Sequence, residues 1–241
     1  MGMILPDHLQ RLQFYASAAF PCSYLADRQA QSLIATPQHL VDTTVYSELI
    51  RHGFRRSGEF VYRPYCTDCQ ACVPVRLQAS EFQANRSQRR AQKQHRGLTI
   101  QVMTIQFSQE HYALYQSYQR HRHAGSGMDH EDEGQYRDFL LQSNVDTILI
   151  EFRDAGQLRM VSLVDCVQDG LSAVYTFYDC NDSRAAFGTY NVLWLTEWCR
   201  QLQLPYLYLG YWIEHSRKMA YKKNFSPLQG FQHGEWQLLE K

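Results

Sequence analysis

The sequence predicts a mixed α+β protein in two parts: a small cysteine-rich N-terminal domain, residues 1–84, and a larger domain, residues 97–241. Three observations indicate this organisation. Three of the seven cysteines lie together in the segment CTDCQAC. The stretch NRSQRRAQKQHR contains five Lys or Arg residues and no acid, so we interpret residues 85–96 as a basic junction. Beyond it the hydrophobic period changes repeatedly between helical and strand spacing.

The N-terminal part is expected to contain short elements. Thr43–Arg51 has helical periodicity, and Phe54–Tyr62 is a candidate strand interrupted at Gly58. Val73–Leu77 resembles an edge strand, because Pro74 has no amide proton to donate to a neighbouring strand.

The larger domain is expected to begin with two helices, followed by three strands connected by short turns. The expected elements are helices at Ser108–His123 and Gly134–Gln142, strands at Thr147–Phe152, Leu158–Cys166 and Leu171–Tyr178, a helix at Asn191–Leu202, a strand at Pro205–Tyr211 and a short basic helix at Ser216–Lys223. A three-stranded meander followed by a helix and a further strand matches the order in GNAT-type acetyltransferases. We therefore predict a GNAT-like acyltransferase domain.

Composition excludes several classes of protein. The 24 Lys and Arg residues balance 24 Asp and Glu residues, which argues against broad coating of nucleic acid but allows a local basic patch. The apolar stretches are shorter than the roughly 20 residues needed to cross a bilayer. The N-terminus lacks the basic start and cleavage site of a signal peptide. We expect a cytoplasmic protein that makes no membrane contact.

The cysteine cluster has the spacing of a metal site. Cys66, Cys69 and Cys72 are spaced C-x2-C-x2-C, and Cys22 is the other cysteine of the N-terminal half. Two thiolates at C-x2-C spacing can bind one ion around a tight turn. Structural zinc and an iron–sulfur cluster both fit this pattern, and a set of reduced thiols without metal is the alternative. Four thiolates would leave no open coordination position, so we expect any metal to be structural.

Several motifs occur in the order found in one enzyme family. They are Pro21-Cys22-x-Tyr24-Leu25, YRPYCTDCQACVPVR at 62–76, NRSQRR at 85–90, Arg122-His123 with Gly127-Met128, and GYWI, KMAYKKNF and a proline within 210–227. This set resembles the arginyltransferase-like aminoacyl-tRNA–protein transferases, and most of all the bacterial aspartate/glutamate leucyltransferases. The resemblance extends over nearly the whole chain.

The resemblance implies an enzyme that transfers leucine from leucyl-tRNA to the N-terminal amine of acceptor proteins that begin with Asp or Glu, which creates an N-degron. The chemistry then requires no cofactor, and we expect a monomer. Arginyl-tRNA as the donor and a coenzyme-A-dependent GNAT N-acetyltransferase remain alternatives, as does a metal-ribbon protein that binds nucleic acid. The loop at 184–190 lacks the spacing of a coenzyme-A phosphate loop, which favours a tRNA donor.

Substrate-binding candidates follow from the charges that these substrates carry. For the tRNA phosphates we expect basic residues in two stretches, with Tyr211 stacking on a terminal base; the basic residues are Arg86, Arg89, Arg90, Arg217, Lys218, Lys222 and Lys223. For the acidic side chain of the acceptor we expect Arg76 first and Arg63 second.

Proton transfer requires a titratable group near the reacting amine. Asp179, next to Tyr178 at the end of a predicted strand, is the first candidate. Glu214 and His215, which follow the last long strand, come next.

Overall fold

The computed structural model describes residues 11–122, 132–184, 186–216 and 218–239 and confirms a mixed α+β fold. The largest element is an eight-stranded sheet with the strand order β14-β13-β7-β12-β11-β10-β9-β8. Its strands are β7 (Val73–Gln78), β8 (Thr99–Thr104), β9 (Thr147–Asp154), β10 (Gln157–Val167), β11 (Gly170–Tyr178), β12 (Tyr206–Trp212), β13 (Leu228–Gln232) and β14 (Glu235–Leu238). The predicted meander is confirmed as β9, β10 and β11.

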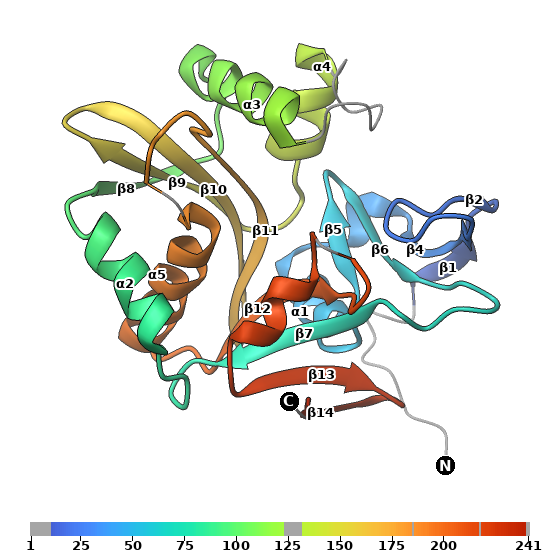
Figure 1. Cartoon of the computed structure of the whole chain (residues 1–241). Coiled ribbons are helices and arrows are strands. Elements are labelled where there is room, and N and C mark those ends of the chain that lie inside the picture. Colours follow the sequence, from blue (N-terminus) through green and yellow to red (C-terminus); the bar gives the residue numbers. More distant parts are fainter. Residues whose placement is uncertain (1–10, 123–131, 185, 217, 240–241) are drawn as a thin grey trace.

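Helices cover both faces of this sheet (Figure 1). α2 (Arg86–His95) and α5 (Phe187–Gln201) pack on one face, and α3 (Gln109–Arg122) lies on the other with α4 (Glu133–Tyr136) and the turn η2 (Arg137–Leu141). Alternating strand residues supply the two cores: Met160 joins the α5 side and Val161 the α3 side. The helices predicted at 108–123, 134–142 and 191–202 correspond to α3, to α4 with η2, and to α5.

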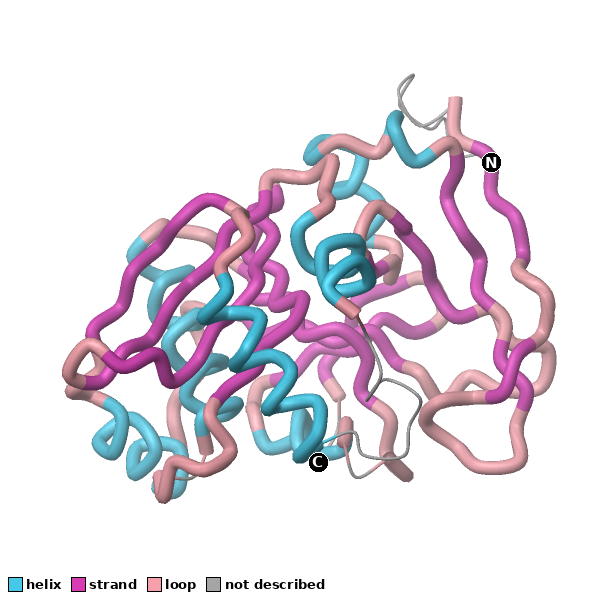
Figure 2. The backbone as a smooth tube through the Cα atoms, turned by 90° about the horizontal axis from the view of Figure 1, so that it is seen from above, coloured by secondary structure: helices cyan, strands magenta, loops and turns pink. Residues whose placement is uncertain are grey.

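The N-terminal residues form two small sheets at one end of the molecule (Figure 2). The strands are β1 (Gln13–Ala16), β2 (Phe20–Pro21), β3 (Gln29–Ala30), β4 (Ser32–Thr36), β5 (Arg55–Ser57) and β6 (Phe60–Pro64), with the turn η1 (Gln38–Leu40) and helix α1 (Thr43–Arg51) between β4 and β5. α1 has the predicted bounds, because the Asp42 side chain accepts a hydrogen bond from Val45 N at its start.

Two local predictions differ from the structure. The interrupted strand at 54–62 is a hairpin, β5 and β6, that turns at Gly58 with φ +58°. β7 is an interior strand rather than an edge strand. Pro74 is tolerated there because the pairing with β13 includes Val75, Arg76 and Leu77 and does not extend to the proline.

The basic stretch that we interpreted as a junction forms α2. Asn85 and Gln88 make a capping box at its start, and its buried residues Ala91 and His95 face α5. The His95 ring lies 4.3 Å from the Phe187 ring, centroid to centroid. At the C-terminal end, the helix predicted at Ser216–Lys223 is a shorter 3₁₀ helix, η3 (Ala220–Asn224). No helix in the described part of the chain has the length and apolar character to cross a membrane.

Candidate functional site

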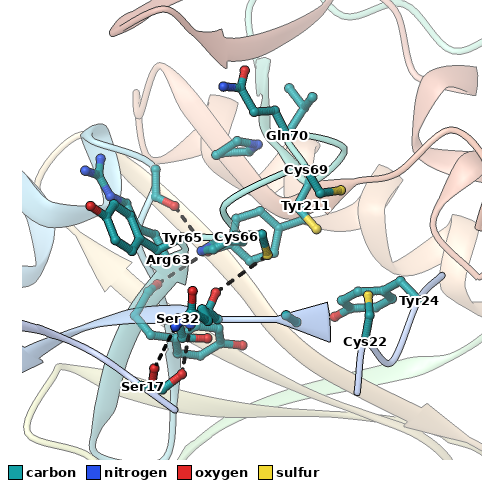
Figure 3. Close-up of a pocket in the computed structure, with 18 of the residues that line it drawn as sticks. Ser17, Cys22, Tyr24, Ser32, Arg63, Tyr65, Cys66, Cys69, Gln70 and Tyr211 are labelled. Carbon is teal, nitrogen blue, oxygen red and sulfur yellow. Dashed lines mark hydrogen bonds between the residues drawn. The ribbon is translucent and has the colours of Figure 1, made fainter. Parts of the chain in front are cut away.

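A cavity of about 730 Å³ lies between the small N-terminal sheets and the neighbouring ends of β7, β12 and β13 (Figure 3). Cys22, in the segment between β2 and β3, lines it together with Cys66, Cys69 and Cys72 of the loop that joins β6 to β7. The fold thus brings Cys22 to the same cavity as the cysteine cluster, across more than 40 residues of chain.

The four thiols share this cavity, but no three of them are grouped closely enough to hold an ion. Among the described residues, no three His, Cys, Asp or Glu side chains form a group that could hold an ion. Burial raises the pKa of Cys72 to about 12, and Cys22, Cys66 and Cys69 contribute to that shift through their negative potential. Four sulfur donors fit zinc or an iron–sulfur cluster, and binding would require the sulfur atoms to move together and the thiols to lose their protons.

The cavity wall is positively charged. Arg28 and Arg63 line it, and no Asp or Glu is found among the described lining residues. The Arg63 guanidinium lies 5.1 Å from the centre of the Phe54 ring, and its Nη1 donates to His52 O at 3.4 Å. A ligand with a negative charge is the natural occupant of such a cavity.

Two buried cations lie behind this wall, where β11 and β12 diverge. The strands pair in parallel only as far as Ser172 and Tyr208. At that point Arg55 Nη1 donates to Ser172 Oγ at 2.9 Å, and Arg55 Nη2 donates to Ala173 O at 2.7 Å. Lys222 Nζ donates to Tyr211 O at 2.6 Å. Burial, with a contribution from Arg55, lowers the pKa of Lys222 to about 7.

A second group of polar side chains lies at the C-terminal end of β11. Tyr178 stacks on Phe187 at the start of α5, with the ring centres 5.5 Å apart, and contacts Tyr118 of α3. The pKa of Tyr178 is raised by burial, while the nearby Arg122 opposes that shift. Arg122 belongs to one of the family motifs in the sequence, and the fold places it next to Tyr178.

The two basic stretches lie side by side on the surface. Gln88 Nε2 of α2 donates to Asn224 O of η3 at 3.0 Å, and Lys223 lines the same shallow pocket as Asn85. Arg86, Arg89 and Arg90 are exposed along α2. The Lys223 ammonium lies 5.1 Å from the centre of the Trp212 ring. Sequence alone could not show that residues so far apart in the chain form one basic surface.

Two predicted substrate-binding residues occupy unexpected places. Arg76 does not line the cavity: it is buried, with its guanidinium 3.5 Å from the centre of the Tyr206 ring and 4.3 Å from that of Trp236. Lys222 is also buried, so its ammonium is not presented to a phosphate at the surface. Arg76 is buried because strand alternation turns its side chain toward the aromatic rings of Tyr206 and Trp236. Lys222 is buried because η3 directs its ammonium to the carbonyl oxygen of Tyr211.

The remaining predicted residues lie in different parts of the structure. Tyr211 and Arg63 line the cavity. Glu214, His215 and Lys218 are exposed after β12. Asp179 pairs with Arg159, Nη1 to Oδ2 at 2.8 Å, and accepts from Asn181 N. Arg217 lies outside the described residues.

Sequence reasoning missed Arg55 and the tyrosines around it. Arg55 is one of two adjacent arginines in a three-residue strand, and nothing in that short pattern distinguishes them. Tyr24 and Tyr62 fall within two of the family motifs, and both line the cavity. The motifs were the available signal for these two tyrosines.

Two family models match this chain. The one described as "Arginine-tRNA-protein transferase, N terminus" matches residues 20–90, and the one described as "Arginine-tRNA-protein transferase, C terminus" matches residues 110–232.

Curated relatives match over nearly the whole length. An aspartate/glutamate leucyltransferase of Methylobacillus flagellatus is 61% identical over 97% of this chain and 95% of its own. The leucyltransferase of Nitrosospira multiformis is 55% identical over 95% of this chain and 91% of its own. That of Thiobacillus denitrificans is 56% identical over 96% of this chain and 96% of its own. Among solved structures, L-PGS from Bacillus licheniformis has a TM-score of 0.46 and 10% identity, over 59% of this chain and 46% of that chain.

Proposed function

The chain belongs to the arginine-tRNA-protein transferase family, and we infer that it transfers leucine from leucyl-tRNA to the N-terminal amine of proteins that begin with Asp or Glu. The observation that carries this inference is the 61% identity with an aspartate/glutamate leucyltransferase over 97% of the chain. The predicted enzyme class, an aminoacyltransferase, is confirmed by the same relatives.

The reaction exchanges one acyl bond for another. The neutral α-amine of the acceptor attacks the carbonyl carbon of the leucyl ester, a C–N bond forms, and the ester C–O bond to the terminal ribose breaks. The proton lost by the amine ends on the ribose oxygen, so atoms and charge balance without a cofactor. An α-amine has an ordinary pKa of about 7.7–8.0, so a share of it is neutral at physiological pH. The protein must therefore supply mainly orientation and stabilisation of the oxyanion.

The basic surface of α2 and η3 is our candidate for the tRNA. The exposed Arg86, Arg89 and Arg90, together with Lys223, come from two elements that contain no Asp or Glu and form a basic surface of the kind that neutralises a phosphate backbone. The surface is close to β12, whose end carries Trp212 next to Lys223. An acceptor stem bound here would direct its charged end toward the diverging ends of β11 and β12.

The candidates for proton transfer lie near those strand ends. Glu214 and His215 are exposed directly after β12 and are accessible to a bound substrate. Asp179 directly follows β11. Because it pairs with Arg159, we assign it to holding the turn after β11 and not to proton transfer. Tyr178 could donate a hydrogen bond to the oxyanion, because the positive Arg122 lies beside it.

The cysteines are our candidate ligands for a structural metal. Cys22, Cys66, Cys69 and Cys72 would hold zinc or an iron–sulfur cluster, which when bound would tie the β2–β3 segment to the cysteine loop. Leucine transfer itself would rely on side chains of the protein. We further propose that the product is an N-degron and that the enzyme acts as a monomer in the cytoplasm, where charged tRNA is present.

A labelling experiment tests the proposed function. The purified protein is incubated with leucyl-tRNA or arginyl-tRNA carrying a labelled amino acid, or with labelled acetyl-coenzyme A, and with peptides that begin with Asp, Glu or Ala. We expect leucine label in the Asp and Glu peptides only. Label from acetyl-coenzyme A alone would overturn the proposal in favour of an acetyltransferase, and label from arginyl-tRNA alone would change the donor.

A further inference from the structure

Arg55 is a buried cation with no acidic partner among the described residues. Its side chain is 8% exposed, and it donates to one hydroxyl and one backbone carbonyl. No carboxylate of the described residues lies within 4.0 Å of it, whereas Arg56, the buried arginine next to it, and the partly buried Arg51, Arg153 and Arg159 each pair with an acid. A buried charge without a counter-charge is unfavourable, so Arg55 is a candidate for a functional role.

The adjacent residue shows the contrast. Arg56, on the same short strand, is buried to a similar degree but pairs with Asp165 through two hydrogen bonds. The fold therefore provides an acid for one of two neighbouring arginines and leaves the other with neutral acceptors. A guanidinium has five N–H donors, and the described residues use two of those of Arg55.

The surroundings of Arg55 add to its positive potential. Lys222 is buried nearby, and the Arg55 charge acts on Lys222 as well as on the hydroxyls of Tyr24, Tyr62 and Tyr211. These three tyrosines line the cysteine cavity. Arg55 does not itself line the cavity. As the strand partner of the lining residue Tyr62 it lies behind a wall that contains no acid among the described residues.

The position of Arg55 is fixed by a glycine. Gly210 of β12 has φ +76°, and a Cβ built there would lie 3.2 Å from Arg55 Nε and 3.3 Å from Arg55 Cζ. The guanidinium therefore packs against bare backbone at the point where β11 and β12 separate. In the proposed function, the charged end of the tRNA is directed toward this same point.

We propose that Arg55, supported by Lys222, binds the side-chain carboxylate of the N-terminal Asp or Glu of the acceptor protein and thereby selects acidic acceptors. The proposal rests on the proposed function, because it assigns the acceptor site of that same reaction. A guanidinium binds a carboxylate with two parallel hydrogen bonds, which an amide cannot reproduce without its charge. Of the other candidates, Arg76 is enclosed by the rings of Tyr206 and Trp236, and Arg63 lines the cavity and is the competing residue that the test includes.

The test compares isosteric acceptors. Leucine transfer is measured with peptides that begin with Asp or Asn and are otherwise identical, in the wild-type protein and in Arg55→Gln, Arg55→Lys and Arg63→Gln. In the wild type we expect a strong preference for Asp. In Arg55→Gln the ratio of kcat/KM for Asp to that for Asn should fall about 10- to 100-fold, the effect of losing a charge-assisted hydrogen bond. Arg55→Lys should retain part of the preference, and Arg63→Gln most of it.

A merely structural role gives a different result. If Arg55 only braces the strands, Arg55→Gln lowers transfer to both peptides equally and leaves the ratio unchanged, which overturns the proposal. A shift of the preference in Arg63→Gln instead would also overturn it. A large increase in the Kd for leucyl-tRNA in Arg55→Gln, with the ratio intact, would assign Arg55 to a tRNA phosphate and reject the acceptor role.

Binding without transfer separates this proposal from the proposed function. Calorimetry of the wild-type protein with the Asp peptide, in the absence of tRNA, should show binding that the Asn peptide and Arg55→Gln lack. If the Asp peptide binds in this way but leucine is not transferred, the acceptor site is supported and the assignment of leucyl-tRNA as the donor is wrong. If leucine is transferred and the Asp peptide binds to Arg55→Gln as tightly as to the wild type, the proposed acceptor site at Arg55 is wrong and the proposed function is retained.

Discussion

Arg56 and Asp165 form an ion pair in the interior of the protein. Arg56 Nη2 lies 2.6 Å from Asp165 Oδ1, Arg56 Nε donates to Asp165 Oδ2 at 3.0 Å, and the side chains are 1% and 0% exposed. Thr147 Oγ1 donates to the same carboxylate. The pair joins the β5–β6 hairpin of the N-terminal region to β10 in the centre of the large sheet, so it connects the cavity wall to the main core.

Removing one member of this pair should therefore be costly. Asp165→Asn leaves a buried guanidinium without its counter-charge, and we expect a loss of about 3–5 kcal/mol in the free energy of unfolding. Urea unfolding measures it. The control is Glu133→Gln, which breaks the exposed pair between Glu133 and Arg137. These two side chains are 46% and 45% exposed, so this variant should lose less than about 1 kcal/mol of unfolding free energy. Equal losses in the two variants would show that the buried pair does not hold the two parts together.

Elements whose ends are marked by local chemistry were predictable from the sequence. α1 matches because Asp42 caps it. The strands β9 to β11 match because turns at 155–156 and 169–170 separate them. Local signals failed where tertiary context decides, as at Pro74, whose place inside a sheet depends on where β13 leaves β7.

Function was predictable from motif order, while individual site residues were less so. An arginine in sequence carries no information on whether its guanidinium meets an acid, an aromatic ring or neither. Arg56, Arg76 and Arg55 represent these three cases in turn. Burial of Lys222 likewise depends on the fold of η3 against β12, which a run of basic residues does not reveal.

The basic surface gives a prediction about tRNA binding. Replacing Arg86 and Arg90 with Gln should reduce the slope of log K for tRNA against log salt by about 0.7–0.9 for each phosphate that the variant no longer neutralises. Lys222→Met should leave that slope unchanged, because the ammonium is buried, and serves as the matched control. Filter binding at several salt concentrations measures the slope. If Lys222→Met changed the slope as much as the arginine variant does, the assignment of tRNA binding to this surface would be wrong.

Asp182 should make stability depend on pH. A hydrogen bond from Arg184 is the main cause that lowers the pKa of Asp182 from 3.8 to about 2. Because the folded state binds the proton less tightly than the unfolded state, this stabilisation is present above pH 4 and is lost as the pH falls toward 2. Asp182→Asn should thus cost ~2 kcal/mol at pH 7. Urea unfolding at pH 7, 5 and 3 should show the difference between the proteins narrowing only at the lowest pH. A constant difference would refute this linkage.

Gly210 should be needed for the position of Arg55. Gly210→Ala places a methyl group 3.2 Å from Arg55 Nε at φ +76°, so it should displace the guanidinium as well as strain the backbone. Gly156→Ala is the control, since Gly156 has φ +84° but open space around its Cβ. Both should lose about 1–2 kcal/mol of stability from the backbone. Only Gly210→Ala should also reduce the preference for Asp over Asn acceptors, measured by leucine transfer. An unaltered preference would mean that Arg55 tolerates the displacement.

The cysteine cavity gives a prediction about metal content. If Cys22 and the cluster at 66–72 bind one ion, protein purified without oxygen should contain zinc, or iron with inorganic sulfide, and Cys22→Ala and Cys69→Ala should each lose most of it. Cys166→Ala is the control, because Cys166 lies on β10 and does not line the cavity.

Thiolates around a tetrahedral ion with bonds of about 2.3 Å lie within roughly 4 Å of one another, so binding must draw the cysteine loop toward the β2–β3 segment. A chelator should then lower the Tm of the wild type but not that of Cys22→Ala, since metal-binding energy contributes directly to folding. Full metal content in Cys22→Ala would show that Cys22 is a packing residue of the cavity wall.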